Sequence, residues 1–117
     1  MTLKEFYEAA GGSYEETLRR LMNEKLAKKY LLMFAQAKDY EEMREALEAG
    51  QWGDAFRHVH NLKGVSLNLG LGRLSAACSE LCDALRSGEP TTDLAPLTAA
   101  VEAAYAQVLE GLEGLEE

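Results

Sequence analysis

The chain has 117 residues with only two prolines, two cysteines and 47% hydrophobic residues, which suits one domain with a sizeable core over residues 1–117. Few β-branched residues and abundant Ala, Leu and Glu predict an all-α protein. The net charge of −8 argues against nucleic-acid or anionic-membrane partners, which normally require a basic face. The N-terminal segment has no apolar run typical of a signal peptide, and no segment approaches the ~20 apolar residues that span a bilayer, so we expect a cytoplasmic protein.

The first half of the chain predicts four helices. Thr2 is expected to cap a short helix over 2–10, and Gly11-Gly12 to end it. Ser13 with Glu16 has the spacing of a capping box, opening a helix to about residue 22. A third helix over about 24–36 presents Leu26, Tyr30, Met33 and Phe34 on one side. Asp39 is then expected to cap a helix over 39–49, with Tyr40, Met43 and Leu47 facing inward.

Three longer helices follow, over about 52–69, 71–87 and 93–114. Asp93 should cap the last of them, with Pro96 in its first turn, where a missing N–H does no harm. Helices of this length with short connections predict an antiparallel four-helix bundle over about 24–117, with additional short N-terminal helices in 1–23. The sequence leaves open whether 24–36 or 39–49 completes the bundle.

The helix over 52–69 carries the most informative residues. At about 100° per residue, its inward stripe holds six residues: Trp52, Ala55, Val59, Leu62, Ser66 and Leu69. His60 lies about 140° from the middle of this stripe and should therefore face solvent. Lys63 follows one turn later on the same flank, and Gly64 lies one turn on near the solvent side.

The presence of Gly64 inside a helix requires an explanation, since glycine lowers helix stability by about 1 kcal/mol relative to alanine. One interpretation is access, because a missing Cβ lets a partner approach the imidazole closely. The alternative is a kink or close helix packing, which explains little if Gly64 faces solvent. Lys63 can be an ordinary surface lysine, or its ammonium can neutralise a group attached to the His60 ring.

The pattern His60-x-x-Lys63-Gly64, with Gly70 ten residues after the histidine and Leu74 four further on, resembles the histidine-containing phosphotransfer (HPt) domain of bacterial and fungal phosphorelays. Cys78 and Leu81 follow at helical spacing, and the resemblance covers about residues 24–117. It implies that His60 is the phosphoacceptor, that Lys63 offsets the charge of the phosphoryl group, and that Gly64 clears the approach of the partner.

Further residues join this candidate site with less specificity. Phe56 and Leu67 bracket His60 on the same side of the helix; they are either scattered apolar residues or a small docking patch. In HPt domains the neighbouring helix often supplies a polar residue near the histidine, and Ser79 occupies that region here, with Cys82 and Asp83 nearby.

Other chemistries find little support. His58 should lie at the edge of the core, hydrogen-bonded, and i,i+2 histidines on a helix cannot share one metal, so no metal site is expected. Cys78 and Cys82 are expected as free thiols at core and boundary positions, and no cation appears placed to activate Cys82. The chain has no glycine-rich ATP loop, so we expect a phosphotransfer intermediate without its own ATP site.

The resemblance therefore implies a carrier of a two-component phosphorelay, with receiver domains of response regulators as partners and a hybrid histidine kinase as a further candidate. No cofactor is expected on this chain, since Mg²⁺ should come with the receiver. A monomer is expected, and the initial Met favours a free-standing protein. The alternative is an adaptor that docks on a receiver or histidine kinase without accepting phosphate, and a third option is a purely structural bundle.

Overall fold

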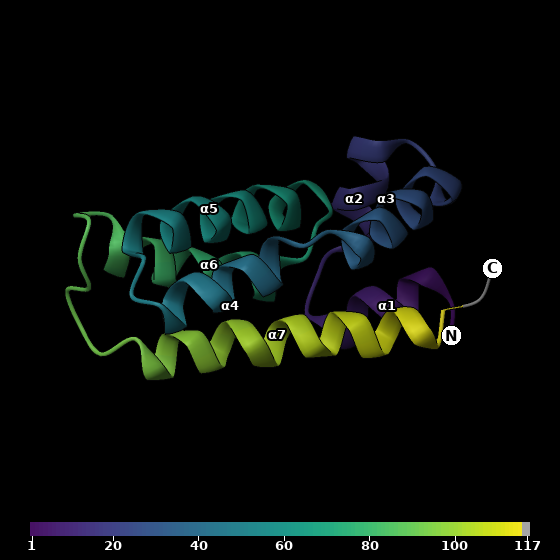
Figure 1. Cartoon of the computed structure of the whole chain (residues 1–117). Helices are drawn as coiled ribbons and strands as arrows, with labels where there is room; N and C mark the ends of the chain where they lie inside the picture. The colour runs from purple at the N-terminus through teal and green to yellow at the C-terminus, as the bar shows by residue number, and fades with distance from the viewer. Residues whose placement is uncertain (116–117) are drawn as a thin grey trace.

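The computed structural model describes residues 1–115, and within that range it is all-α, as the composition predicts (Figure 1). The helices are α1 (Leu3–Ala10), α2 (Tyr14–Leu21), α3 (Glu24–Gln36), α4 (Asp39–Glu48), α5 (Trp52–Asn68), α6 (Gly72–Leu85) and α7 (Ala95–Glu113). Among the described residues, no helix has the length and apolar character needed to cross a membrane.

Helices α4, α5, α6 and α7 form the antiparallel bundle, so the fourth member that the sequence left open is α4 (Figure 1). The ring of Tyr40 on α4 stacks on that of Tyr105 on α7, with centroids 4.1 Å apart and planes 5° apart. Arg44 on α4 also pairs with Glu102 on α7. These contacts close the bundle between its first and last helices.

The three N-terminal helices gather at the far end of the bundle, around the second half of α7 (Figure 1). Phe6 of α1 packs so closely on Gly111 of α7 that a Cβ there would lie 2.7 Å from its ring. Phe34 of α3 meets Tyr105 of α7 with ring centroids 5.6 Å apart. One half of α7 thus packs against the other bundle helices, and the other half packs against the N-terminal helices.

The predicted caps are partly confirmed. Thr2 forms a complete capping box with Glu5, and the Ser13 side chain accepts a hydrogen bond from the Glu16 N–H. Asp39 was wrongly predicted as a cap: Lys38 precedes α4 without a side-chain cap, and the Asp39 carboxylate turns to His58. Asp93 accepts from the Ala95 N–H at 3.1 Å but lies one residue before the N-cap position.

The inward face of α3 differs from the prediction. This helix buries Ala27, Leu31 and Phe34, whereas Tyr30 and Met33 remain exposed. Phe34 is buried as predicted, but the centre of the buried face lies about 80° around the helix from the centre of the predicted stripe. The periodicity of apolar residues predicted the α3 helix correctly. Packing against the neighbouring helices determined which of its apolar side chains are buried.

Candidate functional site

Helix α5 holds His60 outward because its opposite stripe is buried. Ala55, Val59, Leu62 and Ser66 are buried, and the Ser66 hydroxyl donates to the Leu62 carbonyl at 2.6 Å. His60 lies on the other side of the helix and is exposed, as the helical period predicts. Gly70, at a φ of +71°, ends the segment, and Leu71 N–H donates to the Ser66 carbonyl.

Phe56 lies one turn before His60 and contacts it. The ring centroids are 5.7 Å apart with an interplanar angle of 36°. Phe56 is partly buried and also packs against the hydrophobic core. Leu67 is 56% exposed on the same side of α5. The two apolar residues expected to bracket His60 therefore differ, since one supports the ring and the other projects into solvent.

Arg86, at the end of α6, is a neighbour that the sequence analysis missed. Its guanidinium carbon lies 5.7 Å from the centre of the Phe56 ring, within the range of a cation–π contact. The same side chain pairs with Asp83 at 3.0 Å. A signal existed in the sequence, because Arg86 follows Ser79 and Cys82 at helical spacings and so lies on the same side of α6.

Lys63 is half-buried on α5, and Cys82 is buried on α6. Burial raises the pKa of the Cys82 thiol, and the nearby charges of Lys63 and Arg86 act in the opposite direction. The expectation that no cation lies near Cys82 was therefore wrong. The thiol is nevertheless a poor nucleophile, because burial outweighs both cations.

Gly64 is exposed, and a Cβ built on it would meet no atom within 4 Å. Close helix packing therefore does not explain this glycine, which leaves the surface next to His60 low and open. Ser79 is half-buried on α6, and the side-chain hydrogen bonds of that helix do not join it to the His60 ring. The structure therefore adds no contact to the role suggested for Ser79.

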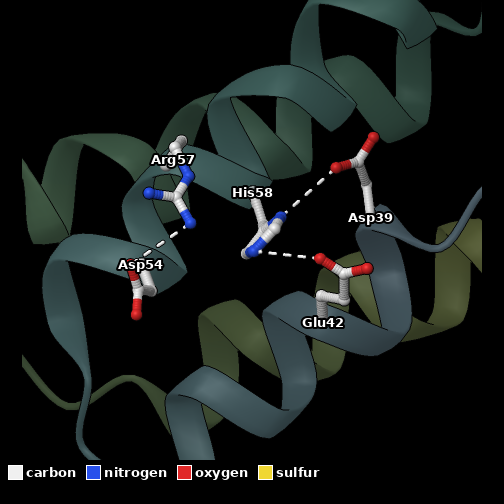
Figure 2. A network of polar contacts seen from close by, with 5 residues as sticks. All are labelled: Asp39, Glu42, Asp54, Arg57 and His58. Atoms are coloured by element: carbon white, nitrogen blue, oxygen red, sulfur yellow. Dashed lines mark hydrogen bonds and ion pairs between the residues drawn. The ribbon is translucent and has the colours of Figure 1, made fainter.

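His58 lies on the α4 side of α5, as Figure 2 shows. Its Nδ1 is 3.3 Å from Asp39 Oδ1, and its Nε2 is 3.3 Å from Glu42 Oε2. Both ring nitrogens are thus engaged, in agreement with the hydrogen-bonded role predicted for His58 at the edge of the core. In the same view Arg57 pairs with Asp54 on the surface.

The polar clusters do not form a metal centre. Within residues 1–115, no group of three or more His, Cys, Asp or Glu side chains is placed to hold a metal ion. Asp39 and Glu42 approach opposite nitrogens of His58, so the three side chains do not converge on one point. Cys78 and Cys82 are buried free thiols, as predicted.

Comparison with known proteins identifies the family of the chain. The family model of the Hpt domain matches residues 32–114, which include the whole bundle and the end of α3. Searches of curated proteins and of solved structures found no match. Because the family model covers more than half of the sequence, and because His60 stands on the outer face of the bundle, the chain belongs to the Hpt domain family.

Proposed function

We propose that His60 is the residue of this chain that accepts the phosphoryl group from an aspartate of one receiver domain and passes it to another. Hpt domains in general carry phosphoryl groups on histidine in two-component signalling, and they interact with receiver domains and kinases. The observation that carries the proposal is the exposed imidazole on α5, beside a glycine with open space in front of it.

The transfer is a substitution at phosphorus. The lone pair of the neutral imidazole, at Nε2 in our proposal, attacks the aspartyl phosphate while Nδ1 keeps its proton. The N–P bond forms as the bond to the aspartate oxygen breaks, and the aspartate leaves as a carboxylate. Reversal of these steps at a second receiver returns the phosphoryl group to an aspartate and the ring to its neutral form.

Lys63 and Arg86 would supply positive charge for the added phosphoryl group. Lys63, half-buried on the His60 flank of α5, would neutralise the phosphoryl group directly. Arg86 reaches the site through Phe56 and adds a second positive charge at its edge. Phe56 supports the His60 ring and Leu67 offers an apolar contact to the receiver, while Ser79 is a candidate hydrogen-bond donor to the attached phosphoryl group.

The partner supplies what this chain lacks under the proposal. The receiver brings the aspartate and the Mg²⁺, so this chain acts as a carrier with no cofactor and no ATP site of its own. The carrier works in the cytoplasm as a monomer, with receiver domains as partners and a hybrid kinase as one source of phosphate. The interface is transient and centres on the His60 face.

The test is transfer of label from a receiver domain that carries radiolabelled aspartyl phosphate. Wild-type chain is expected to acquire acid-labile label, and His60→Gln to acquire none while keeping its helical circular dichroism. His58→Gln is the matched control, because it removes the other histidine of α5 and should still accept label. Binding without transfer across a panel of receivers would support the adaptor instead, and label on His60→Gln would place the acceptor elsewhere.

A further inference from the structure

An apolar groove of about 500 Å³ lies between α2, α3 and the end of α5. Phe34 and Leu69 are among the buried residues that line it, and Tyr30, Met33 and Val65 form its exposed edges. Its volume is within the ~300–1,000 Å³ of typical ligand sites. The groove exists because α3 turns Tyr30 and Met33 away from the core.

The exposed apolar edges of this groove are unusual for the chain. Three of the seven large hydrophobic residues that remain exposed within residues 1–115 border this groove, namely Tyr30, Met33 and Val65, and Met33 is 55% exposed. Isolated exposed apolar residues are ordinary, but a group of them around a hollow marks an interaction surface. Methionine suits such a surface because its flexible side chain adapts to the shape of a partner.

Charge indicates the chemistry of the partner. Residues 17–38 carry six of the twelve Lys and Arg side chains of the chain and only one of its twenty acidic side chains. Arg20 lines the groove, held by hydrogen bonds from Nη1 to the carbonyl oxygens of Leu67 (2.6 Å) and Asn68 (3.0 Å), and no carboxylate belongs to the lining. Arg20 is therefore the charged side chain in the lining of this groove, whereas Lys25, Lys28 and Lys29 of α3 line the separate hollow beside Leu32.

The groove is separate from the His60 surface. Val65 and Asn68, which line it, lie about 140° and 80° around α5 from His60. Residues 1–31, which include α1, α2 and most of α3, also precede the part of the chain that matches the family model. A partner in this groove would contact α2, α3 and the end of α5, and would leave the imidazole uncovered.

We propose that this groove binds an acidic amphipathic helix of a partner protein, independently of phosphotransfer at His60. Apolar side chains along one face of that helix would enter the groove, and its flanking carboxylates would face Arg20. A helix fits better than a membrane, because a concave site between three helices suits a convex rod rather than a flat surface. It also fits better than a small molecule, because the apolar edges project outward and would stay in water around a small ligand.

The experiment uses the full chain and two synthetic 16-residue helical peptides. Both carry leucine at i, i+3, i+4 and i+7, and their remaining positions hold alanine with either glutamate or lysine; binding is measured by fluorescence anisotropy. The glutamate peptide should bind at least tenfold more tightly than the lysine peptide, and added NaCl should weaken its binding. His60→Gln should bind it unchanged, so this outcome does not depend on the phosphotransfer proposal.

Two variants of α3 locate the site. Met33→Asp should weaken binding of the glutamate peptide at least tenfold, whereas Leu32→Asp should weaken it less than twofold. The pair is well matched, since both residues are 55% exposed and both changes add one negative charge, but Leu32 faces a different hollow beside Leu112. Circular dichroism of both variants should equal that of the wild type, because neither residue is buried.

Four results would overturn the proposal. These are absence of peptide binding, equal binding of the two peptides, equal effects of the two α3 substitutions, and a partner of another class. The last would appear as Met33-dependent binding to vesicles containing phosphatidylglycerol, or as a dimer in sedimentation that Met33→Asp dissociates, with no binding of the glutamate peptide in either case.

Discussion

The hydroxyl of Tyr7 donates a 2.7 Å hydrogen bond to the carbonyl oxygen of Leu69, and so joins the first helix to the end of the helix that carries His60. The Thr17 hydroxyl lies 3.1 Å from the same oxygen, and Arg20 binds the carbonyl oxygens of Leu67 and Asn68. Carbonyl groups in the last turn of a helix have no partner within it, and those that are buried must find one elsewhere. The N-terminal helices provide these partners for α5.

Tyr7→Phe should therefore lower the free energy of unfolding by about 1 kcal/mol, because the buried hydrogen bond is lost while the ring remains. Urea denaturation followed by circular dichroism measures the change. Tyr14→Phe is the control, since it removes a hydroxyl whose bond to Glu24 is exposed, and should cost less than about 0.5 kcal/mol. Equal effects would mean that the Tyr7 bond contributes nothing beyond a surface bond.

Lys63→Ala should slow phosphoryl transfer about tenfold, equivalent to about 1.4 kcal/mol of barrier, because a cation one helical turn from His60 is removed. Lys63→Arg should recover most of the rate, since the charge is retained. Single-turnover transfer from a labelled receiver measures both variants.

Arg86→Gln tests whether charge at the edge of the site matters as much. It should slow transfer less than Lys63→Ala, because Arg86 contacts Phe56 rather than His60 and is already paired with Asp83. A wild-type rate for Lys63→Ala would remove the role assigned to that residue.

Gly64→Ala should raise the free energy of unfolding by about 0.5–1 kcal/mol, because the helix gains alanine and the new methyl group meets no atom within 4 Å. Gly64→Leu should also fold, yet slow transfer from the receiver by adding bulk one turn from His60. Thermal unfolding and label transfer measure the two effects separately.

Gly53→Leu serves as the control for added bulk, because Gly53 is also exposed on α5 with open space beside it. It lies about 10 Å from His60 along the helix axis, against about 6 Å for Gly64, so its effect on transfer should be smaller. Normal transfer by Gly64→Leu would show that the open approach is not needed.

Stability should fall in alkaline solution because of Cys78. Burial raises the pKa of this thiol from 9.0 to about 12, so between these values the unfolded chain has lost a proton that the folded chain retains. The free energy of unfolding then decreases with rising pH, by up to about 1.4 kcal/mol per pH unit from this group. Urea denaturation at pH 8, 9 and 10 measures the slope.

Cys78→Ala should unfold more easily at neutral pH, because it leaves a small cavity, but its stability should depend less steeply on pH above 9. Some dependence should remain, since burial also raises the pKa of Cys82 and Tyr7. An unchanged slope in Cys78→Ala would assign the alkaline loss to those groups alone.

The helical period alone was enough to predict the exposed position of His60, the buried stripe behind it and the free space in front of Gly64. These are properties of one helix, set by about 100° per residue, so they do not depend on which neighbours pack against it. The all-α class and the bundle follow from the same pattern repeated along the chain.

The tertiary structure decided what depends on contacts between distant residues. Stacking of Tyr40 on Tyr105 made α4 the fourth helix of the bundle, and packing of α3 on α7 left Tyr30 and Met33 exposed beside the groove. The residue type of Asp39 predicted a helix cap, but packing of α4 against α5 brings its carboxylate to His58 instead. Local periodicity can place a side chain on a face of its own helix, but which group covers that face is a property of the whole packed chain.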